Sequence, residues 1–307
     1  MQETYDLIII GAGPAGLSAS IYASRYKLNH LLLGATIGGQ INEIRQLENW
    51  PGDKSVSGFD LLSRFVEHTK SLGISPQNES VVEIKKSDED VFEVVTGKTT
   101  HKTRAIIMAM GTEYRKLNVP GEKELTGKGV SYCATCDAMF FRNKVVSVIG
   151  GGNAAATSAL GLTDFASKVY LVYRGDRLPA EPIWLDKIAA NPKIEVIKNT
   201  NIIEIKGEQK VEKVILDKAY NDKTYLETDG VFVEIGSEPG IELAERLGVE
   251  IDEQGYIKVN ADMGTNIPGI FAAGDITTGS NKFRQIITAS AEGAVAANGV
   301  YKMLKLK

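Results

Sequence analysis

Two mainly apolar runs, the first of them unbroken, are each followed at once by closely spaced glycines and stand out in the pattern of hydrophobic and polar positions. Residues 7–10 lead into the sequence GAGPAG at 11–16, and residues 144–149 lead into three glycines at 150–152. Runs without polar alternation are typical of strands buried on both faces of a parallel sheet. A helix and a second apolar strand are expected after each loop. The pattern therefore predicts two strand–helix–strand units in one chain.

The glycine spacing indicates dinucleotide binding. In G-x-G-x-x-G the glycines permit a tight turn and let the backbone approach a pyrophosphate, which the N-terminus of the next helix attracts. The strand–turn–helix context of the first loop is correct, but Gly34 stands where an acidic residue would hold a ribose. Because the pattern recurs, we expect two nucleotide-binding units.

The remaining pattern indicates that one unit interrupts the other. A short apolar strand at 269–275 ends in Gly-Asp and precedes an alanine-rich helix at 289–304. Segments at 112–120 and 236–240 contain Gly or Pro and are interpreted as linkers. We expect an α/β fold of two Rossmann-like nucleotide-binding domains with three layers (ββα), the second inserted in the first. The predicted domains are 1–113 plus 242–307, and 114–241.

A further helix is predicted at 58–72. Phe59, Leu62, Phe65 and Val66 recur along it at helical spacing and form one apolar face. Such a stripe is expected to pack in the core rather than to bind a partner.

The composition narrows the function classes. The 307 residues are 43% apolar and 24% charged, as expected for a globular protein of two ordinary domains. A net charge of −4 without a basic tract gives no electrostatic basis for nucleic-acid binding. No apolar run approaches the roughly 18 residues that span a bilayer, and the N-terminus has no signal-peptide pattern. We expect neither a nucleic-acid nor a membrane partner.

The only two cysteines form one pair, Cys133-Ala134-Thr135-Cys136, followed by Asp137. A C-x-x-C pair can close a small disulfide and exchange electrons with the disulfide of another protein. The alternatives are a structural bridge or half of a zinc site, but zinc needs about four ligands and the three histidines are isolated from the pair. No metal site is expected, and one thiol pair favours the reducing cytoplasm.

These motifs, in this order and separation, give the chain a family likeness. GAGPAG at 11–16, GGQ at 38–40, ENWPG at 48–52 and the cysteine pair resemble low-molecular-weight thioredoxin reductases over nearly the whole chain. The second glycine loop, Gly274-Asp275 and Arg284-Gln285 match as well. The resemblance implies an FAD-dependent thioredoxin-disulfide reductase, usually a homodimer. Such an enzyme passes electrons from NADPH through FAD to a cysteine pair and on to thioredoxin or a thioredoxin-like protein.

The resemblance also implies roles for individual residues. Cys136 would face the flavin, Cys133 would attack the thioredoxin disulfide, and Asp137 would transfer protons. The family commonly lacks the acidic residue that Gly34 replaces. The residues expected around FAD are Gly11, Gly13, Pro14, Ala15, Gly16, Gly34, Gly38, Gly39, Gln40, Asn49, Val82, Gly274, Asp275, Arg284, Gln285 and Ile286. Those expected around the second nucleotide are Gly150, Gly152, Asn153, Ala154, Ala155 and Arg174.

The second nucleotide site departs from the family pattern. Members that use NADPH typically have an acidic residue, a serine and a glutamate where this chain has Asn153, Ala154 and Thr157. Of their three cations after the next strand only Arg174 is kept, although Arg177 could substitute. A 2′-phosphate needs charge-assisted donors, so three electron donors stay open. They are NADPH by family default, NADH, and reduced ferredoxin as a protein donor.

Other functions use similar motifs. Flavoproteins that reduce ferredoxin or flavodoxin lack the cysteine pair, and the flavoprotein of a peroxide-reducing system has an added N-terminal domain. A non-enzymatic nucleotide sensor would not need the redox pair. A dithiol oxidase that passes electrons from a small molecule to oxygen keeps all of these motifs and stays an alternative.

Overall fold

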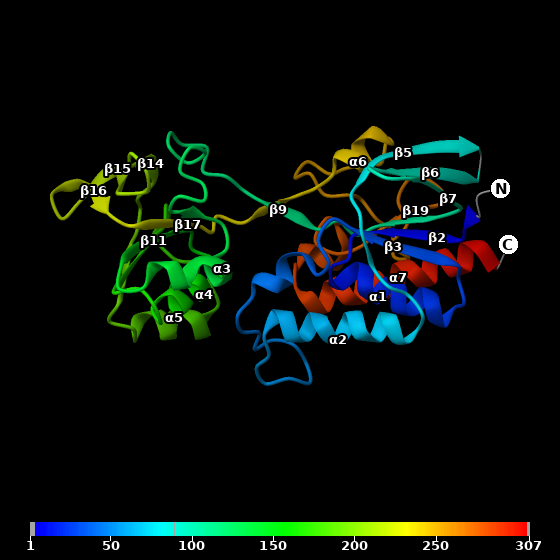
Figure 1. Cartoon of the computed structure of the whole chain (residues 1–307), viewed down its shortest axis with the longest axis horizontal. Coiled ribbons are helices and arrows are strands. Elements are labelled where there is room, and N and C mark those ends of the chain that lie inside the picture. Colours follow the sequence, from blue (N-terminus) through cyan, green and yellow to red (C-terminus); the bar gives the residue numbers. More distant parts are fainter. Residues whose placement is uncertain (1–3, 89, 306–307) are drawn as a thin grey trace. The chain divides into compact units, whose positions relative to one another are not determined.

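The structure, a computed structural model, describes residues 4–88 and 90–305. The chain divides into two compact units, one formed by Met1–Glu113 with Glu238–Lys307 and the other by Tyr114–Ser237. The first, discontinuous unit is interrupted by the second, inserted unit (Figure 1). A five-stranded parallel sheet lies at the centre of each.

In the discontinuous unit, the first glycine loop follows the carboxyl end of a strand of the central sheet. The spatial order of this sheet is β19-β8-β2-β3-β4, and all neighbouring pairs are parallel. The apolar run that predicted a buried strand is β2, and all four of its residues are buried. The strands are β2 (Leu7–Ile10), β3 (His30–Gly34), β4 (Gln77–Asn78), β8 (Ile106–Met108) and β19 (Ile270–Ala272).

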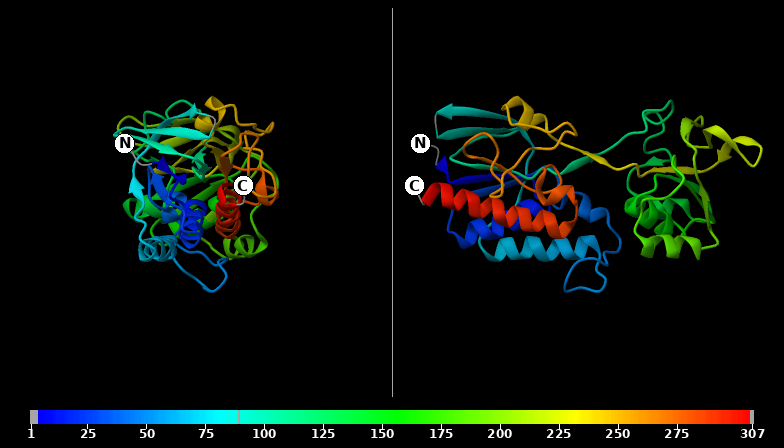
Figure 2. Two further views of the ribbon diagram at one scale, coloured as in Figure 1. Left: turned by 90° about the vertical axis from the view of Figure 1, so that its right-hand side faces the viewer. Right: turned by 180° about the vertical axis from the view of Figure 1, so that it is seen from behind.

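Three helices cover one face of this sheet, and Figure 2 (right) shows them side by side. They are α1 (Pro14–Arg25), α2 (Gly58–Ser71) and α7 (Ile286–Lys305). Helices α1 and α7 approach closely because Gly293 has no side chain: a Cβ there would lie 2.0 Å from the carbonyl oxygen of Ala15. The contact between these helices therefore depends on a glycine in the middle of α7.

The predicted apolar face of α2 is partly wrong. Leu62 is buried, but the Phe59 side chain is 64% exposed. Gly58 is the residue turned toward the body of the unit, since a Cβ there would lie 1.8 Å from the carbonyl oxygen of Ile41. One position further along a helix turns the side chain by about 100°, so Phe59 points away from the core.

A four-stranded sheet packs on the opposite face of the central sheet. Its order is β1-β7-β6-β5, and Ile8, Phe92 and Val94 are buried between the two sheets. A short helix, α6 (Glu242–Arg246), also belongs to this side (Figure 1). The strands are β1 (Thr4–Tyr5), β5 (Val81–Asp88), β6 (Val91–Thr96) and β7 (Thr100–Thr103).

The inserted unit repeats the same three layers. Its parallel sheet has the order β10-β17-β11-β12-β13, and it separates two apolar clusters, one against helices and one against an antiparallel sheet. The central strands are β10 (Val130–Ser131), β11 (Val145–Ile149), β12 (Lys168–Val172), β13 (Ile194–Ile197) and β17 (Gly230–Val233). The helices are α3 (Ala134–Asp137), α4 (Asn153–Leu162) and α5 (Pro182–Ala189), and the antiparallel strands are β14 (Ile202–Lys206), β15 (Lys213–Tyr220) and β16 (Lys223–Glu227).

The segments interpreted as linkers pair with each other. Strands β9 (Thr112–Tyr114) and β18 (Ser237–Pro239) form a two-stranded ribbon where the chain passes between the units. Within residues 4–88 and 90–305, no helix combines the length and hydrophobicity required to cross a membrane.

Candidate functional site

The first glycine loop connects β2 to α1 and leaves its second glycine open. Gly16 packs against the loop itself, since a Cβ there would lie 1.7 Å from the carbonyl oxygen of Gly11. By contrast, a Cβ on Gly13 would meet only the carbonyl oxygen of Gly38, at 3.9 Å. Gly13 is also the N-cap of α1, and no side chain caps this helix. Open backbone beside uncapped helical N–H groups is what a phosphate group requires.

Residues from two further segments adjoin this loop. A Cβ on Gly39 would come within 3.9 Å of Gly13 Cα and nothing nearer, so these two glycines flank a space free of side chains. The Gln40 amide donates to the carbonyl oxygen of Thr112 at 2.7 Å, which ties the short helical segment Gly39–Glu43 to the start of β9. Asn49 donates to Gln285 Oε1 at 2.9 Å.

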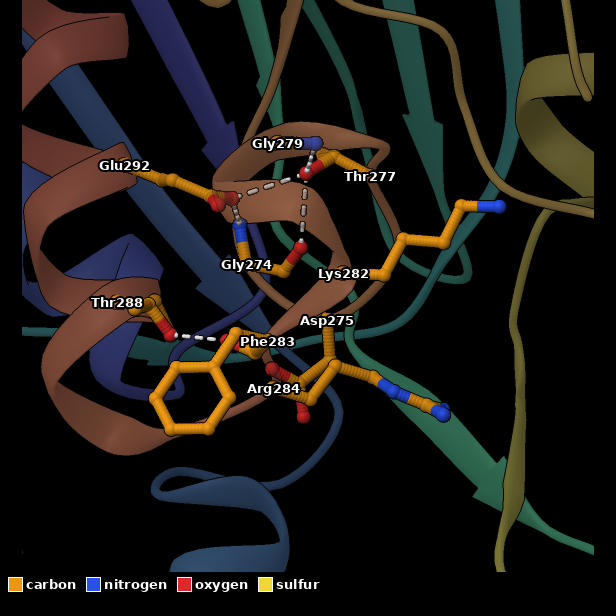
Figure 3. A pocket seen from close by; sticks show the side chains of 10 residues that line it. Gly274, Asp275, Thr277, Gly279, Lys282, Phe283, Arg284, Thr288 and Glu292 are labelled. Atoms are coloured by element: carbon orange, nitrogen blue, oxygen red, sulfur yellow. Dashed lines mark hydrogen bonds between the residues drawn. The ribbon is translucent and has the colours of Figure 1, made fainter.

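Figure 3 shows the pocket that follows β19, with Asp275 and Arg284 in its lining. Gly274 has a φ of +83° and turns the chain directly before Asp275. Burial raises the pKa of the Asp275 carboxyl to about 6; the nearby Arg284 guanidinium lowers it and the Glu292 carboxylate raises it. Lys282 is engaged elsewhere, in an ion pair with Asp252 at 2.5 Å.

In the inserted unit, Cys133 and Cys136 form a disulfide with a Cα–Cα distance of 5.4 Å. Cys133 is the N-cap of α3, and the Cys136 N–H donates to its Sγ at 3.1 Å. Cys136 is exposed, while Cys133 and Asp137 are half-buried. Within the described residues there is no group of three or more His, Cys, Asp or Glu side chains that could hold a metal ion.

The segment before the disulfide is anchored by a buried carboxylate. Glu122 is 4% exposed and accepts hydrogen bonds from the N–H groups of Leu117 and Asn118 and from the Tyr132 hydroxyl, which lies at 2.8 Å. Burial, together with this hydrogen bond, raises the pKa of Tyr132 to about 12. Tyr132 directly precedes Cys133, so Glu122 helps to fix the chain at the redox pair.

The second glycine loop connects β11 to α4. Gly152 is open, with nothing within 4 Å of a Cβ there, and no side chain caps α4. The Tyr173 ring lies against Gly151, where a Cβ would meet it at 2.5 Å. Asn153 and Glu181 exchange two hydrogen bonds: the Asn153 amide donates to Glu181 Oε1 at 2.9 Å, and the Glu181 N–H donates to Asn153 Oδ1 at 2.8 Å.

Known proteins resemble this chain over nearly its whole length. Residues 5–293 match the family described as pyridine nucleotide-disulphide oxidoreductase. The thioredoxin reductase of Bacillus subtilis (strain 168) is 43% identical over 303 residues, which cover 97% of this chain and 94% of that protein. The chain belongs to the thioredoxin reductase family. This confirms the resemblance recognised from its motifs.

Solved structures of the thioredoxin reductase family agree with the fold. The Lactococcus lactis thioredoxin reductase in its FR conformation matches with a TM-score of 0.93 and 39% identity, over 98% of this chain and 99% of that one. A ferredoxin-flavin thioredoxin reductase from Clostridium acetobutylicum is 35% identical over the full length of both chains, with a TM-score of 0.55. The predicted α/β fold of two Rossmann-like domains is confirmed.

The first loop and its surroundings fit the FAD that the thioredoxin reductase family implies. The space flanked by Gly13 and Gly39 would be filled by any side chain, and the adjacent N-terminus of α1 suits a diphosphate. Asp275 lines a pocket and could accept hydrogen bonds from hydroxyl groups of the dinucleotide. Val82, which was also predicted near FAD, lies on β5 with its side chain 50% exposed.

Sequence reasoning missed contacts that only folding creates. Glu292 contacts the turn that follows β19, and Tyr173 covers Gly151. Glu292 could have been singled out in the sequence only as the one acidic residue of an alanine-rich helix. No local signal pairs Tyr173 with a glycine that far back in the chain.

Proposed function

We propose that this chain reduces the disulfide of thioredoxin or a thioredoxin-like protein, with electrons supplied by NADPH through FAD. The observation that carries the proposal is the disulfide Cys133–Cys136 of the inserted unit. It is partly exposed, as exchange with the disulfide of another protein requires. The relatives named above are thioredoxin reductases. The redox pair is the only one the sequence offers.

The surroundings of the disulfide favour a protein substrate. Met139 and Phe140 follow the redox pair closely, and their side chains are 64% and 66% exposed. Exposed aromatic and Met side chains are enriched where proteins bind each other. A small-molecule dithiol would not need this surface, so it supports thioredoxin over the dithiol oxidase alternative.

Opening the disulfide takes two electrons and two protons. FAD supplies the transfer of electron pairs between a nicotinamide and a disulfide. Asp137, next to Cys136, would deliver and remove the protons. The Cys133 thiolate then attacks the thioredoxin disulfide, and Cys136 attacks the resulting mixed disulfide, which releases the thioredoxin dithiol and re-forms the Cys133–Cys136 bond. The Cys136 N–H that points at Cys133 Sγ would stabilise the thiolate.

NADPH is the donor that the family implies, and the second glycine loop fits its diphosphate. Gly152 is open at the N-terminus of α4. The 2′-phosphate would rest on Arg174, which is exposed just after β12, with Arg177 as a second exposed cation. NADH and reduced ferredoxin are the other donors to be tested.

The test uses the oxidised, flavin-containing protein without oxygen. Mixing it separately with NADPH, NADH and reduced ferredoxin, and following the loss of flavin absorbance, identifies the donor. Cys136→Ser should abolish thioredoxin reduction while the flavin stays bound, and Thr135→Ser should leave the rate unchanged. Thioredoxin reduction that survives Cys136→Ser contradicts the proposal, and so does protein that neither contains nor takes up FAD.

A homodimer is also proposed. Ile287 and Val295 lie two turns apart on α7, with side chains 40% and 37% exposed. An apolar stripe of this kind fits a contact between two copies. Light scattering during gel filtration measures the oligomeric state, and a monomer at micromolar concentration contradicts this expectation.

A further inference from the structure

One buried carboxylate of the discontinuous unit has no role in the function proposed above. Glu292 is the acidic residue of α7, and it is 7% exposed. Removing a carboxylate from water is unfavourable unless other donors replace the water. The groups that face Glu292 therefore indicate what it does.

Two donors from the turn after β19 satisfy this carboxylate. Glu292 Oε2 accepts the Gly274 N–H at 2.8 Å and the Thr277 hydroxyl at 2.9 Å. Thr277 is 2% exposed, and its hydroxyl oxygen also accepts the Gly279 N–H at 3.0 Å. Figure 3 shows these bonds as one connected set between α7 and the turn.

The turn is shaped around the carboxylate. A Cβ on Gly279 would lie 2.7 Å from Glu292 Oε1, so a larger residue there would have to displace the carboxylate. Gly274 has a left-handed φ of +83°, and its N–H is the group that Glu292 holds. Asp275 is the next residue, so this bond holds the backbone directly before the Asp275 carboxylate.

We infer that Glu292 is a positioning residue of the FAD site: it holds the 274–279 turn so that Asp275 is presented to the dinucleotide. The inference rests on the proposed function, since it concerns the FAD that this function requires. Bonds from N–H and O–H donors to a carboxylate are stronger than bonds between neutral groups. A glutamate therefore holds the turn more firmly than an amide of the same shape.

Replacing Glu292 with glutamine distinguishes two effects on FAD release, the loss of positioning and the loss of a negative charge. FAD carries a negatively charged diphosphate, so removing a nearby negative charge should, taken alone, slow the release of FAD. Loss of positioning should instead speed the release of FAD, because a turn held by weaker bonds presents Asp275 less firmly. We expect Glu292→Gln to release FAD at least tenfold faster than the unchanged protein.

The experiment compares flavin-containing proteins that differ by one side chain. Glu292→Gln and Thr277→Val remove two ends of the same contact, and Ser290→Ala is the control. Ser290 lies on the same helix, and its buried hydroxyl has no hydrogen-bond partner among the described residues. The readouts are the rate of FAD release, followed by flavin fluorescence, and the visible circular dichroism of bound FAD.

The expected result is faster release and an altered dichroism in both variants, a double variant no worse than the more affected single one, and no change in Ser290→Ala. Thr277→Val keeps the test possible should Glu292→Gln fail to fold. Unchanged or slower release in both variants, from flavin-containing parent protein, overturns this inference alone. Parent protein that cannot bind FAD overturns the proposed function and this inference with it.

Discussion

Replacing Asp275 with asparagine should stabilise the flavin-free protein, and more so at neutral than at acidic pH. The folded structure holds the Asp275 pKa at about 6, against an ordinary value of 3.8, mainly because the carboxyl is buried. The folded state therefore binds a proton more tightly than the unfolded state. The contribution of Asp275 to stability is greatest below pH 3.8 and is lost as the pH rises through 6, because folding then requires a charged carboxylate to be buried.

The size of the effect follows from these two pKa values. Linkage gives a penalty of about 1.6 kcal/mol at pH 5 and about 3 kcal/mol at pH 7.5. Asparagine has nearly the same shape and no charge, so the substitution should remove both penalties. The difference of about 1.4 kcal/mol between the two pH values is the decisive quantity, because pH-independent effects of the amide cancel from it.

The two tryptophans allow each unit to be followed separately. Trp50 belongs to the discontinuous unit and Trp184 to the inserted one. In a Trp184→Phe background, urea unfolding monitored by fluorescence reports the unit that contains Asp275. The free energy of unfolding is then measured at pH 5 and at pH 7.5 for the flavin-free protein with and without the Asp275→Asn substitution.

The reasoning is refuted if the stabilisation is the same at both pH values, or if it is larger at pH 5. Either outcome would mean that Asp275 is not a buried carboxyl with a raised pKa. The same substitution should weaken FAD binding, because the dinucleotide loses a carboxylate acceptor. A residue that reduces stability and improves ligand binding is common in functional sites.

Three further predictions concern other parts of the molecule. Phe140→Ala should raise the KM for thioredoxin about tenfold without changing the reduction of a small disulfide reagent, measured by steady-state kinetics, since Phe140 would anchor a protein partner. Arg174→Ala should raise the KM for NADPH about threefold and leave that for NADH unchanged, because one exposed charge contact to the 2′-phosphate is lost; equal effects on both would contradict the assignment. Gly293→Ala should destabilise the discontinuous unit by about 3 kcal/mol in urea unfolding followed at Trp50, because its Cβ would overlap the Ala15 carbonyl.

The elements that sequence predicted best are those whose signal is local. Residues 7–10 are apolar without alternation because β2 is buried on both faces, and the glycines after it are needed by the loop itself. Cys133 and Cys136 are three positions apart, so their pairing needed no knowledge of the fold. A pattern read within one segment is sufficient for such features.

Contacts between distant segments were not predictable in the same way. The segments around Thr112 and Ser237 were interpreted only as linkers, but they pair as β9 and β18, because each supplies the hydrogen-bond partners of the other. Phe59 followed the helical spacing of its neighbours, but the close packing of Gly58 on Ile41 turns it outward. The hydrophobic pattern specifies which residues can be buried, and packing decides which are.

The two glycine loops differ in how much of a dinucleotide each can specify. Both keep an open glycine at an uncapped helix N-terminus, Gly13 in one and Gly152 in the other, so both fit a diphosphate. At the second loop, Tyr173 packs on Gly151, and Asn153 is engaged with Glu181. Recognition of a 2′-phosphate then depends on exposed arginines rather than on a buried pocket, and an exposed charge contact contributes little. We therefore expect the choice between NADPH and NADH to be weak and sensitive to salt, while FAD binding in the first unit is not.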